Sequence, residues 1–321
     1  MWADLKARLL YAGKVRITGE EADTFIARSR AGPGAGGVGS VFFSMNGRRV
    51  RLTLSKTAGA EIVHKGNGQA ILLFEGQEYT GVLEKPGHHC PRQAYLTVTG
   101  SCVYRCRYCN VWRNPGTRRS IDEIEQMVSD VFPDIDAISL TSGVLTDTRE
   151  EEDYVLGVVR RLRHFNLPIG VSIYPSPGTS ERLKDAGATE VKFNLEAATA
   201  ELFSLMCPKM NREDAISALL AAVSIFGKDH VFSNIILGLG ETDEEMTACI
   251  ENLCRHGIMP VIRPLTPGGD LVHYLPPGPE RIVRIARILE QNLLRYGLDP
   301  KNALTMCPAC TGCDLIPGRD T

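Results

Sequence analysis

Several features that would assign this 321-residue sequence to a common class are missing from it. No apolar run reaches the roughly 18 residues that a membrane-spanning helix requires, so we expect no membrane partner. Residues 1–14 carry Asp4, Lys6 and Arg8 among apolar residues and lack the apolar region of a secretory signal. Lys and Arg number 36 and Asp and Glu 38, so the basic excess of a nucleic-acid-binding protein is absent. These absences predict a cytoplasmic protein that binds neither membranes nor nucleic acids.

The composition is otherwise that of a folded domain, with one exception. Hydrophobic residues make up 43% and charged residues 23%, which excludes global disorder. The exception is ten cysteines. In a reducing compartment, clustered thiols are more often metal ligands than disulfide partners, and six of the ten fall into two tight clusters. We therefore expect the function to lie at these clusters.

Shifts in pattern divide the chain into three predicted parts, residues 1–91, 92–266 and 267–321. The N-terminal part begins with a short helix, Asp4 to Tyr11, and continues as a small, largely antiparallel β domain. The C-terminal part holds an amphipathic helix near 279–296 and the second cysteine cluster. The N-terminal β-like runs are Val41 to Met45, Val50 to Leu54, Ala70 to Phe74 and Tyr79 to Leu83.

The central part alternates strand and helix patterns, which is typical of an α/β fold. Six βα units predict a parallel sheet, and right-handed crossovers curl it into a barrel or a doubly wound sheet. The predicted strands are Ala94 to Thr99, Ala137 to Thr141, Ile169 to Tyr174, Glu190 to Glu196, Val231 to Leu237 and Pro260 to Arg263. The predicted helices lie near 120–131, 150–164, 179–187, 213–226 and 243–256.

These strands carry apolar residues on one face and polar residues on the other. Side chains two positions apart share a face, so Lys192, Asn194 and Glu196 point one way and Val191, Phe193 and Leu195 the other. Because a packed barrel interior is filled with branched apolar side chains, a polar lumen predicts an open barrel that holds a ligand. A one-residue error in strand register would reverse the faces.

The first cysteine cluster, Cys102-Val-Tyr-Arg-Cys106-Arg-Tyr-Cys109, directly follows the first predicted strand. This places it at the C-terminal end of the barrel, where barrel active sites lie. Three thiolates are one short of the four that a cubane iron–sulfur cluster usually takes, which leaves one iron open. Zinc is the alternative, but a structural zinc site needs a fourth ligand, such as one from residues 88–90.

With Tyr108 before its last cysteine, this C-x₃-C-x₂-C motif resembles the signature of radical S-adenosylmethionine (SAM) enzymes, over roughly residues 92–266. The resemblance implies a partial (β/α)₆ barrel that holds a [4Fe–4S] cluster on Cys102, Cys106 and Cys109. The open iron would bind SAM. An electron from the cluster would cleave SAM to a 5′-deoxyadenosyl radical that abstracts hydrogen from carbon. An electron donor such as ferredoxin or flavodoxin is implied.

Three further stretches resemble SAM-binding elements of this family. Thr141-Ser142-Gly143 stands where the family has a GGE-like element that meets the methionyl amino group. Asn194-Leu-Glu196 is similar to the ribose-contacting element of biotin and lipoyl synthases, and residues 234–241 resemble the G-x-I-x-G-x-x-E motif beside the adenine, with Asn234 replacing its first glycine. The implied cofactor-binding residues are Tyr108, Thr141, Ser142, Gly143, Ser172, Asn194, Glu196, Ile236, Gly238 and Arg263. Arg263 is equally compatible with a carboxylate clamp and with a salt bridge that caps the barrel.

The second cysteine cluster, Cys307-Pro-Ala-Cys310-Thr-Gly-Cys313, has the spacing with which ferredoxin-type motifs begin, but Pro317 stands at the position of the fourth cysteine. It predicts a second iron–sulfur cluster, with zinc or a reactive tail as alternatives. A fourth ligand could come from Cys90 or from the substrate.

The resemblance to biotin and lipoyl synthases favours one function and leaves two open. The favoured function is sulfur insertion into an octanoyl chain on a carrier protein, with the second cluster as sulfur donor. The two-protein lipoyl synthases of archaea and some bacteria have this plan, which implies a second radical SAM protein as partner. The alternatives are a radical step in small-cofactor biosynthesis without sulfur insertion, and a non-catalytic iron–sulfur protein for electron transfer.

Four other features are interpreted as structural. Gly34-Ala-Gly36-Gly-Val-Gly39 spells G-x-G-x-x-G, but it lacks the flanking strand and helix of a nucleotide loop and is interpreted as a glycine turn or lid. Cys249 and Cys254 are expected to be buried thiols of a helix, and Cys207 to pack in the core. The acidic run at residues 150–153 is expected to be a solvated helix start.

Overall fold

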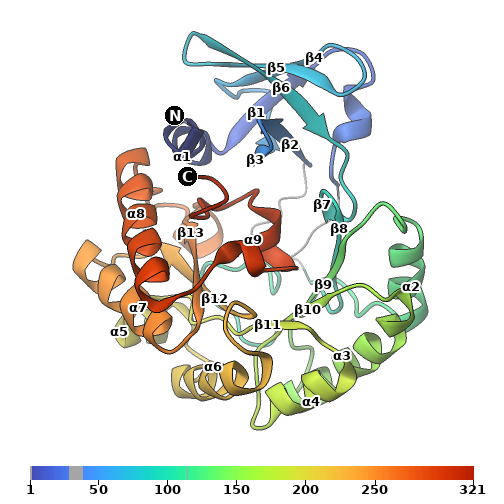
Figure 1. The fold of residues 1–321 in the computed structure, drawn as a ribbon, viewed down its shortest axis with the longest axis vertical. Coiled ribbons are helices and arrows are strands. Elements are labelled where there is room, and N and C mark those ends of the chain that lie inside the picture. Colours follow the sequence, from blue (N-terminus) through green and yellow to red (C-terminus); the bar gives the residue numbers. More distant parts are fainter. Residues whose placement is uncertain (1, 29–38, 114) are drawn as a thin grey trace.

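The computed structural model describes residues 2–28, 39–113 and 115–321. Within these residues the strands form two sheets, a closed six-stranded barrel near the N-terminus and a curled sheet of seven strands. Helices cover the outer side of the second sheet, and the C-terminal segment runs back across its open side (Figure 1). Residues 34–38 of the G-x-G-x-x-G stretch lie outside the described residues, so its interpretation as a turn stays a prediction.

The N-terminal barrel is mostly antiparallel, as predicted, but a parallel strand closes it. Helix α1 (Trp2–Ala12) leads into β1 (Lys14–Thr18), which pairs in parallel with both β3 and β4. The Asn46-Gly47 turn joins β2 to β3 with φ of 53° and 74°, the left-handed values of a tight hairpin. The other strands are β2 (Ser40–Met45), β3 (Arg48–Leu54), β4 (Glu61–His64), β5 (Gln69–Phe74) and β6 (Gln77–Glu84), and η1 (Ala22–Phe25) precedes β2.

The second sheet confirms the predicted partial barrel. Its strands follow one another in chain order, β13-β12-β11-β10-β9-β8-β7, and β8 to β13 are all parallel. The strands are β7 (His89–Cys90), β8 (Gln93–Thr97), β9 (Ala137–Thr141), β10 (Ile169–Ser172), β11 (Glu190–Lys192), β12 (Val231–Leu237) and β13 (Met259–Pro264). The helices are α2 (Ile121–Ser129), α3 (Thr148–Leu162), α4 (Thr179–Ala186), α5 (Ala200–Met206), α6 (Arg212–Phe226), α7 (Asp243–Arg255) and α8 (Pro279–Tyr296).

Three predicted strands end earlier than expected. The strand predicted from Glu190 to Glu196 is regular only to Lys192, because the Asn194 side chain replaces a backbone carbonyl as hydrogen-bond acceptor for the neighbouring strand. Its Oδ1 accepts from the Asn234 backbone N–H at 3.2 Å, and Glu196 then adopts a left-handed φ of 58°. The strands predicted from Ala94 and Ile169 likewise end two residues early, at Thr97 and Ser172. Polar side chains at strand ends compete with the backbone for hydrogen bonds, which strand patterns do not register.

The C-terminal segment fills one end of the barrel lumen. Residues 304 and 305 donate their backbone N–H groups to the buried Glu190 carboxylate at 2.8 and 2.7 Å. The Met306 N–H donates to Gln93 Oε1 and Ser139 Oγ, both at 2.9 Å. Gly170 makes this approach possible, because a Cβ at that position would lie 2.0 Å from Thr305 Oγ1. The lumen therefore holds part of the chain itself at this end and leaves the other end for a ligand.

The C-terminal segment includes η4 (Pro300–Asn302) and α9 (Met306–Cys310), and its end packs against helix α1. The two termini therefore lie close together (Figure 1). There the fully buried Lys6 ammonium pairs with Asp320 at 2.7 Å, and the Trp2 indole N–H donates to the same carboxylate at 3.1 Å. Because an unpaired buried charge is costly, this contact fixes the chain end against α1. The buried side chains of this segment belong to the same apolar core as the half-barrel, and the division at residues 91 and 266 stays a prediction.

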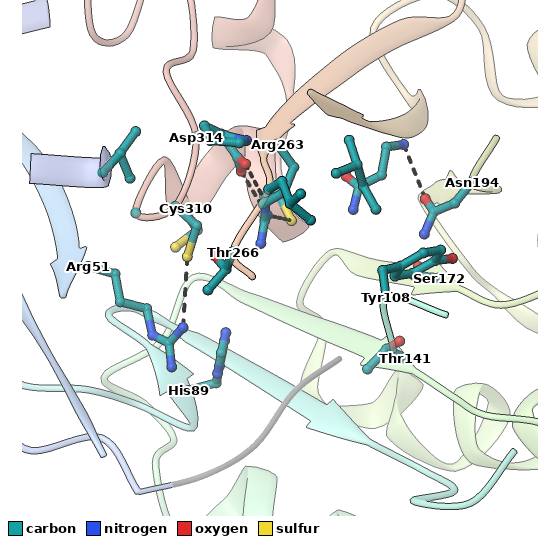
Figure 2. A pocket seen from close by; sticks show the side chains of 18 of the residues that line it. Arg51, His89, Tyr108, Thr141, Ser172, Asn194, Arg263, Thr266, Cys310 and Asp314 are labelled. Atoms are coloured by element: carbon teal, nitrogen blue, oxygen red, sulfur yellow. Dashed lines mark hydrogen bonds and ion pairs between the residues drawn. The ribbon is translucent and has the colours of Figure 1, made fainter. Parts of the chain in front are cut away.

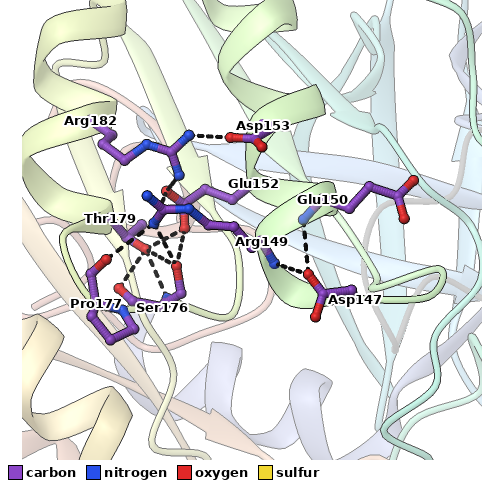
Figure 3. A network of polar contacts seen from close by, with 9 residues as sticks. All are labelled: Asp147, Arg149, Glu150, Glu152, Asp153, Ser176, Pro177, Thr179 and Arg182. Atoms are coloured by element: carbon purple, nitrogen blue, oxygen red, sulfur yellow. Dashed lines mark hydrogen bonds and ion pairs between the residues drawn. The ribbon is translucent and has the colours of Figure 1, made fainter.

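The acidic run corrects one expectation, because two of its four carboxylates are buried. Figure 3 shows Glu152 held by Arg182 and by the hydroxyls of Ser176 and Thr179, at 2.5 and 2.6 Å. Glu151 pairs with Arg118 at 2.7 Å and accepts from two further hydroxyls. The α3 start is therefore not a solvated face, and its carboxylates join α3 to the neighbouring loops. Cys249 and Cys254 are buried in the core, as predicted.

Among the described residues, no helix is both long enough and apolar enough to cross a membrane.

Candidate active site

A cavity of about 200 Å³ lies in the lumen of the half-barrel. Its walls come from the inner face of β8 to β13, the loop after β8, the N-terminal barrel and the C-terminal segment. Figure 2 shows Tyr108, Thr141 and Ser172 on one side of this cavity and Arg51, Cys310 and Asp314 on the other. The polar strand face predicted from the alternating pattern therefore lines the cavity.

The loop with the first cysteine cluster is fixed at both ends by backbone contacts. The Val103 N–H donates to the Val144 carbonyl and the Arg107 N–H to the Met206 carbonyl, both at 2.9 Å. Gly143 lies against the loop so closely that a Cβ there would be 2.0 Å from the Ser101 carbonyl oxygen. Residues after β9 and at the end of α5 therefore hold the cysteine loop over the strand ends.

The three thiols of this loop lie within electrostatic reach of one another. Burial raises the pKa of the Cys102 thiol and raises that of Cys109 to about 12. A hydrogen bond with Cys207, together with burial, raises the pKa of Cys106. Buried thiolates need a neighbouring positive charge, and three thiols on one loop match the donor set of a [4Fe–4S] cluster with one open iron. The residues present thus fit the cluster that the motif implies.

The predicted ribose element faces the same cavity. The Asn194 Nδ2 donates to Glu196 Oε1 at 3.1 Å, and Tyr108 of the cysteine loop hydrogen-bonds the same carboxylate. Burial raises the pKa of Glu196, while Tyr108 and Lys192 oppose this shift. A carboxylate in this position can accept hydrogen bonds from a ligand's hydroxyl groups.

The predicted cofactor residues divide into two groups. Seven of them line the cavity: Tyr108, Thr141, Ser172, Asn194, Glu196, Ile236 and Arg263. Ser142, Gly143 and Gly238 do not. The Ser142 hydroxyl donates to Glu151 at 2.6 Å, Gly143 supports the cysteine loop, and Gly238 has a left-handed φ of 107° at the turn after β12.

Arg263 makes the salt bridge that was one of its two predicted roles. Its Nη2 donates to Asp314 Oδ2 at 2.8 Å and to the Cys307 sulfur at 3.3 Å. Asp314 is buried, so this pair ties the last barrel strand to the C-terminal cysteine segment.

The second cysteine cluster meets the same cavity, and cationic side chains surround it. The Lys192 ammonium lies 3.4 Å from the Cys307 sulfur, and Arg51 Nη1 lies 3.9 Å from the Cys313 sulfur. Burial alone would lower the pKa of Lys192, but the attraction of Cys307 and Tyr95 outweighs it and raises the pKa. Hydrogen bonding from Cys90 lowers the pKa of Cys310 to about 7. The thiolate form is thus favoured at Cys310, whereas burial raises the pKa of Cys313 despite the nearby Arg263 and Arg51.

In the described part of the chain, no three His, Cys, Asp or Glu side chains are already arranged as a metal site. Electrostatic interactions nevertheless link Cys102, Cys106 and Cys109 with one another, and Cys310 with Cys313.

Sequence reasoning assigned no site role to Arg51, Tyr95, Lys192 and Asp314, which all line the cavity. Lys192 could have been identified from the sequence as a cavity residue, because the alternating pattern already placed it on the inner face. Arg51 and Asp314 carry no local signal, because they reach the cavity from the N-terminal barrel and from the C-terminal segment.

Comparison with known proteins agrees with this geometry. The family model of the radical SAM superfamily matches residues 96–253. A lipoyl synthase of Leptospira biflexa serovar Patoc is 27% identical over 209 residues, which cover 60% of this chain and 62% of that protein. A lipoyl synthase of Nocardia farcinica is 25% identical over 240 residues, which cover 66% of this chain and 67% of that protein. The chain thus spans less than two thirds of the Leptospira relative.

Solved structures show the same fold at low identity. The crystal structure of methylornithine synthase (PylB) matches with a TM-score of 0.53 and 17% identity, over 62% of each chain. That of HydG, a maturase of the [FeFe]-hydrogenase, matches with a TM-score of 0.55 and 17% identity, over 65% of this chain and 53% of HydG.

Proposed function

We propose, from the premise that residues 96–253 form a radical SAM domain, that this protein inserts sulfur into C–H bonds of an octanoyl chain carried on a protein lysine. The proposal includes an electron donor such as ferredoxin or flavodoxin and a second radical SAM protein as partners. It rests on the fold, on the likeness to lipoyl synthases, and on the place of the second cysteine cluster.

One observation carries the proposal. Cys307, Cys310 and Cys313 line the same cavity as Tyr108 and the ribose element Asn194-Leu-Glu196. A sulfur donor must reach the carbon from which hydrogen is abstracted, so both groups have to face one space. A cysteine cluster elsewhere on the surface would not meet this requirement.

Cys102, Cys106 and Cys109 would hold the SAM-binding cluster, and Cys307, Cys310 and Cys313 the auxiliary cluster. When bound, the two groups would supply the 5′-deoxyadenosyl radical, formed with an electron from the donor, and the sulfide. Each insertion would break one C–H bond by transfer of its hydrogen atom to that radical, form one C–S bond and leave one electron on cluster iron.

The chain itself would position and shield these groups. Asn194 and Glu196 offer hydrogen bonds to a ligand's hydroxyls. The C-terminal segment closes one end of the lumen and so keeps water from that side of the cavity. Lys192 and Arg263 place positive charge beside Cys307.

Iron and sulfide content after anaerobic reconstitution tests the cluster assignment. We expect about 8 irons per native chain and about 4 in a Cys102/Cys106/Cys109→Ala triple variant. A native content of about 4 with none in the variant would show that the second cluster is zinc or empty. Sulfur donation would then be wrong, and the small-cofactor alternative would take its place.

A product assay tests the reaction. The native protein is incubated with SAM, a low-potential reductant and an octanoyl-lysine peptide, with and without a second radical SAM protein, and products are measured by mass spectrometry. We expect 5′-deoxyadenosine together with a sulfur-bearing octanoyl peptide. 5′-Deoxyadenosine without sulfur incorporation would contradict the proposal in favour of a radical step without sulfur insertion. No SAM cleavage at all would favour a non-catalytic electron-transfer protein.

A further inference from the structure

We infer that Cys90 supplies the fourth thiolate ligand of the auxiliary iron–sulfur cluster, whose other three ligands are Cys307, Cys310 and Cys313. The inference rests on the proposed function, since it presupposes that cluster. The sequence leaves this ligand open, because Pro317 stands where a ferredoxin-type motif has its fourth cysteine. Cys90 lies 217 positions before Cys307, so only the fold could bring it to the site.

Cys90 is fully buried at a rigid position. It lies on β7, where it pairs with Gln93 across a tight antiparallel turn. The Gly87 N–H donates to the Cys90 carbonyl at 3.0 Å, and a Cβ on Gly87 would lie 2.7 Å from the Gln93 carbonyl oxygen. His89 has a left-handed φ of 74°. Strained, closely packed backbone of this kind persists where the surrounding structure fixes a side chain in one place.

The same turn grips the C-terminal segment directly before its first cysteine. The Gln93 side chain receives the Met306 N–H at 2.9 Å and donates to the Met306 carbonyl at 3.2 Å. Cys90 pairs with Gln93 across this turn and Gln93 holds Met306, so Cys90 lies close to the start of the C-terminal cysteines, and its thiol interacts electrostatically with that of Cys310. The Gln93–Met306 contact therefore both fixes the C-terminal segment and places Cys90 next to it.

The surrounding charges favour a cluster with four thiolates. Such a cluster carries net negative charge, and a buried negative charge needs positive neighbours. Lys192 and Arg263 contact Cys307, and Arg51 contacts Cys313. Asp314 offsets one of these charges, since it pairs with Arg263. Lys192 and Arg51 keep their positive charge toward the thiols.

The competing interpretation is that Cys90 is an ordinary buried thiol. The chain provides a matched control in Cys249, which is also buried but lies on α7 with Cys254 as its thiol neighbour. The experiment uses the full chain with Cys102, Cys106 and Cys109 changed to Ala, so that the remaining iron reports the auxiliary cluster alone. Cys90→Ala and Cys249→Ala are added to this background separately and reconstituted anaerobically.

We expect Cys90→Ala to lower the iron content from about 4 to about 3 or fewer per chain and to change the Mössbauer and EPR spectra. Cys249→Ala should leave both unchanged. Equal iron, sulfide and spectra in Cys90→Ala and its background would overturn the inference and leave the proposed function intact. A background that holds zinc or no metal would overturn both.

Circular dichroism checks that each variant folds, and the conservative variant Cys90→Ser provides a second test. If Cys90→Ala fails to fold, Cys90→Ser in the same background decides. An altered cluster spectrum with native circular dichroism supports ligation by residue 90, and an unaltered one overturns it.

Discussion

Arg263 and Asp314 form a two-point ion pair across 51 residues of sequence, in which Nη2 donates to Oδ2 at 2.8 Å and Nε to Oδ1 at 2.5 Å. Arg263 stands on the last barrel strand and Asp314 directly follows Cys313. The pair therefore holds the C-terminal cysteines against the cavity. Because Asp314 is buried, its removal leaves the guanidinium without its partner.

Asp314→Ala should lower the free energy of unfolding by about 3 kcal/mol. Asp153→Ala is the matched control, because Asp153 pairs with Arg182 at the surface, where an ion pair contributes about 0–1 kcal/mol. Urea unfolding of the two variants measures the difference. Equal losses would show that the Arg263–Asp314 pair does not anchor the segment.

Gly170→Ala should displace residues 304–306 from the lumen, because the added methyl would overlap the Thr305 hydroxyl. Limited proteolysis should cut the C-terminal segment faster than in the parent. Gly157→Ala is the control: its Cβ would lie 3.5 Å from Ile121 Cδ1, and Ala in a helix is favoured over Gly by about 1 kcal/mol. We expect Gly157→Ala to be neutral or stabilising. If Gly170→Ala is cleaved at the same rate as the parent, residues 304–306 do not pack against Gly170 in the lumen.

Lys192→Met should lower the reduction potential of the proposed auxiliary cluster by on the order of tens of millivolts, because it removes positive charge beside Cys307. EPR-monitored redox titration in the Cys102/Cys106/Cys109→Ala background measures this potential. Lys184→Met serves as control, since Lys184 lies over the Phe226 ring on the helical side. If Lys192→Met and Lys184→Met give the same reduction potential as their background, Lys192 does not influence the cluster.

Asp243→Asn should destabilise the protein at neutral pH by about 1 kcal/mol and should matter less in acid. Burial raises the pKa of Asp243, but Arg281 and Arg284 outweigh it and hold the pKa below 3.8. A carboxylate with a depressed pKa contributes stability above its unfolded value and loses it as pH falls through the folded value. Urea midpoints of parent and variant should therefore differ at pH 7, and the difference should shrink as pH falls below 3.8 and through the lower folded-state pKa. A difference independent of pH would contradict an electrostatic contribution of the Asp243 carboxylate.

The sequence alone determined those features that are written in local spacing. Helix α8 begins at Pro279 and ends before Gly297 as predicted, because its apolar period and both end signals are local. The alternation along the strands identified the polar face of the cavity, and the spacing of Cys102, Cys106 and Cys109 identified the loop after β8. All of these depend on residues within a few positions of one another.

Only the tertiary structure decided which distant residues meet. Glu151 and Glu152 look solvent-exposed in an acidic run, yet they are buried against Arg118 and Arg182 from other elements. Arg51 enters the cavity from the N-terminal barrel, and the turn that follows Cys90 binds Met306, which directly precedes the C-terminal cysteines. These contacts arise from how layers pack, and no local pattern of residues records which side chains a closed barrel and a folded-back segment bring together.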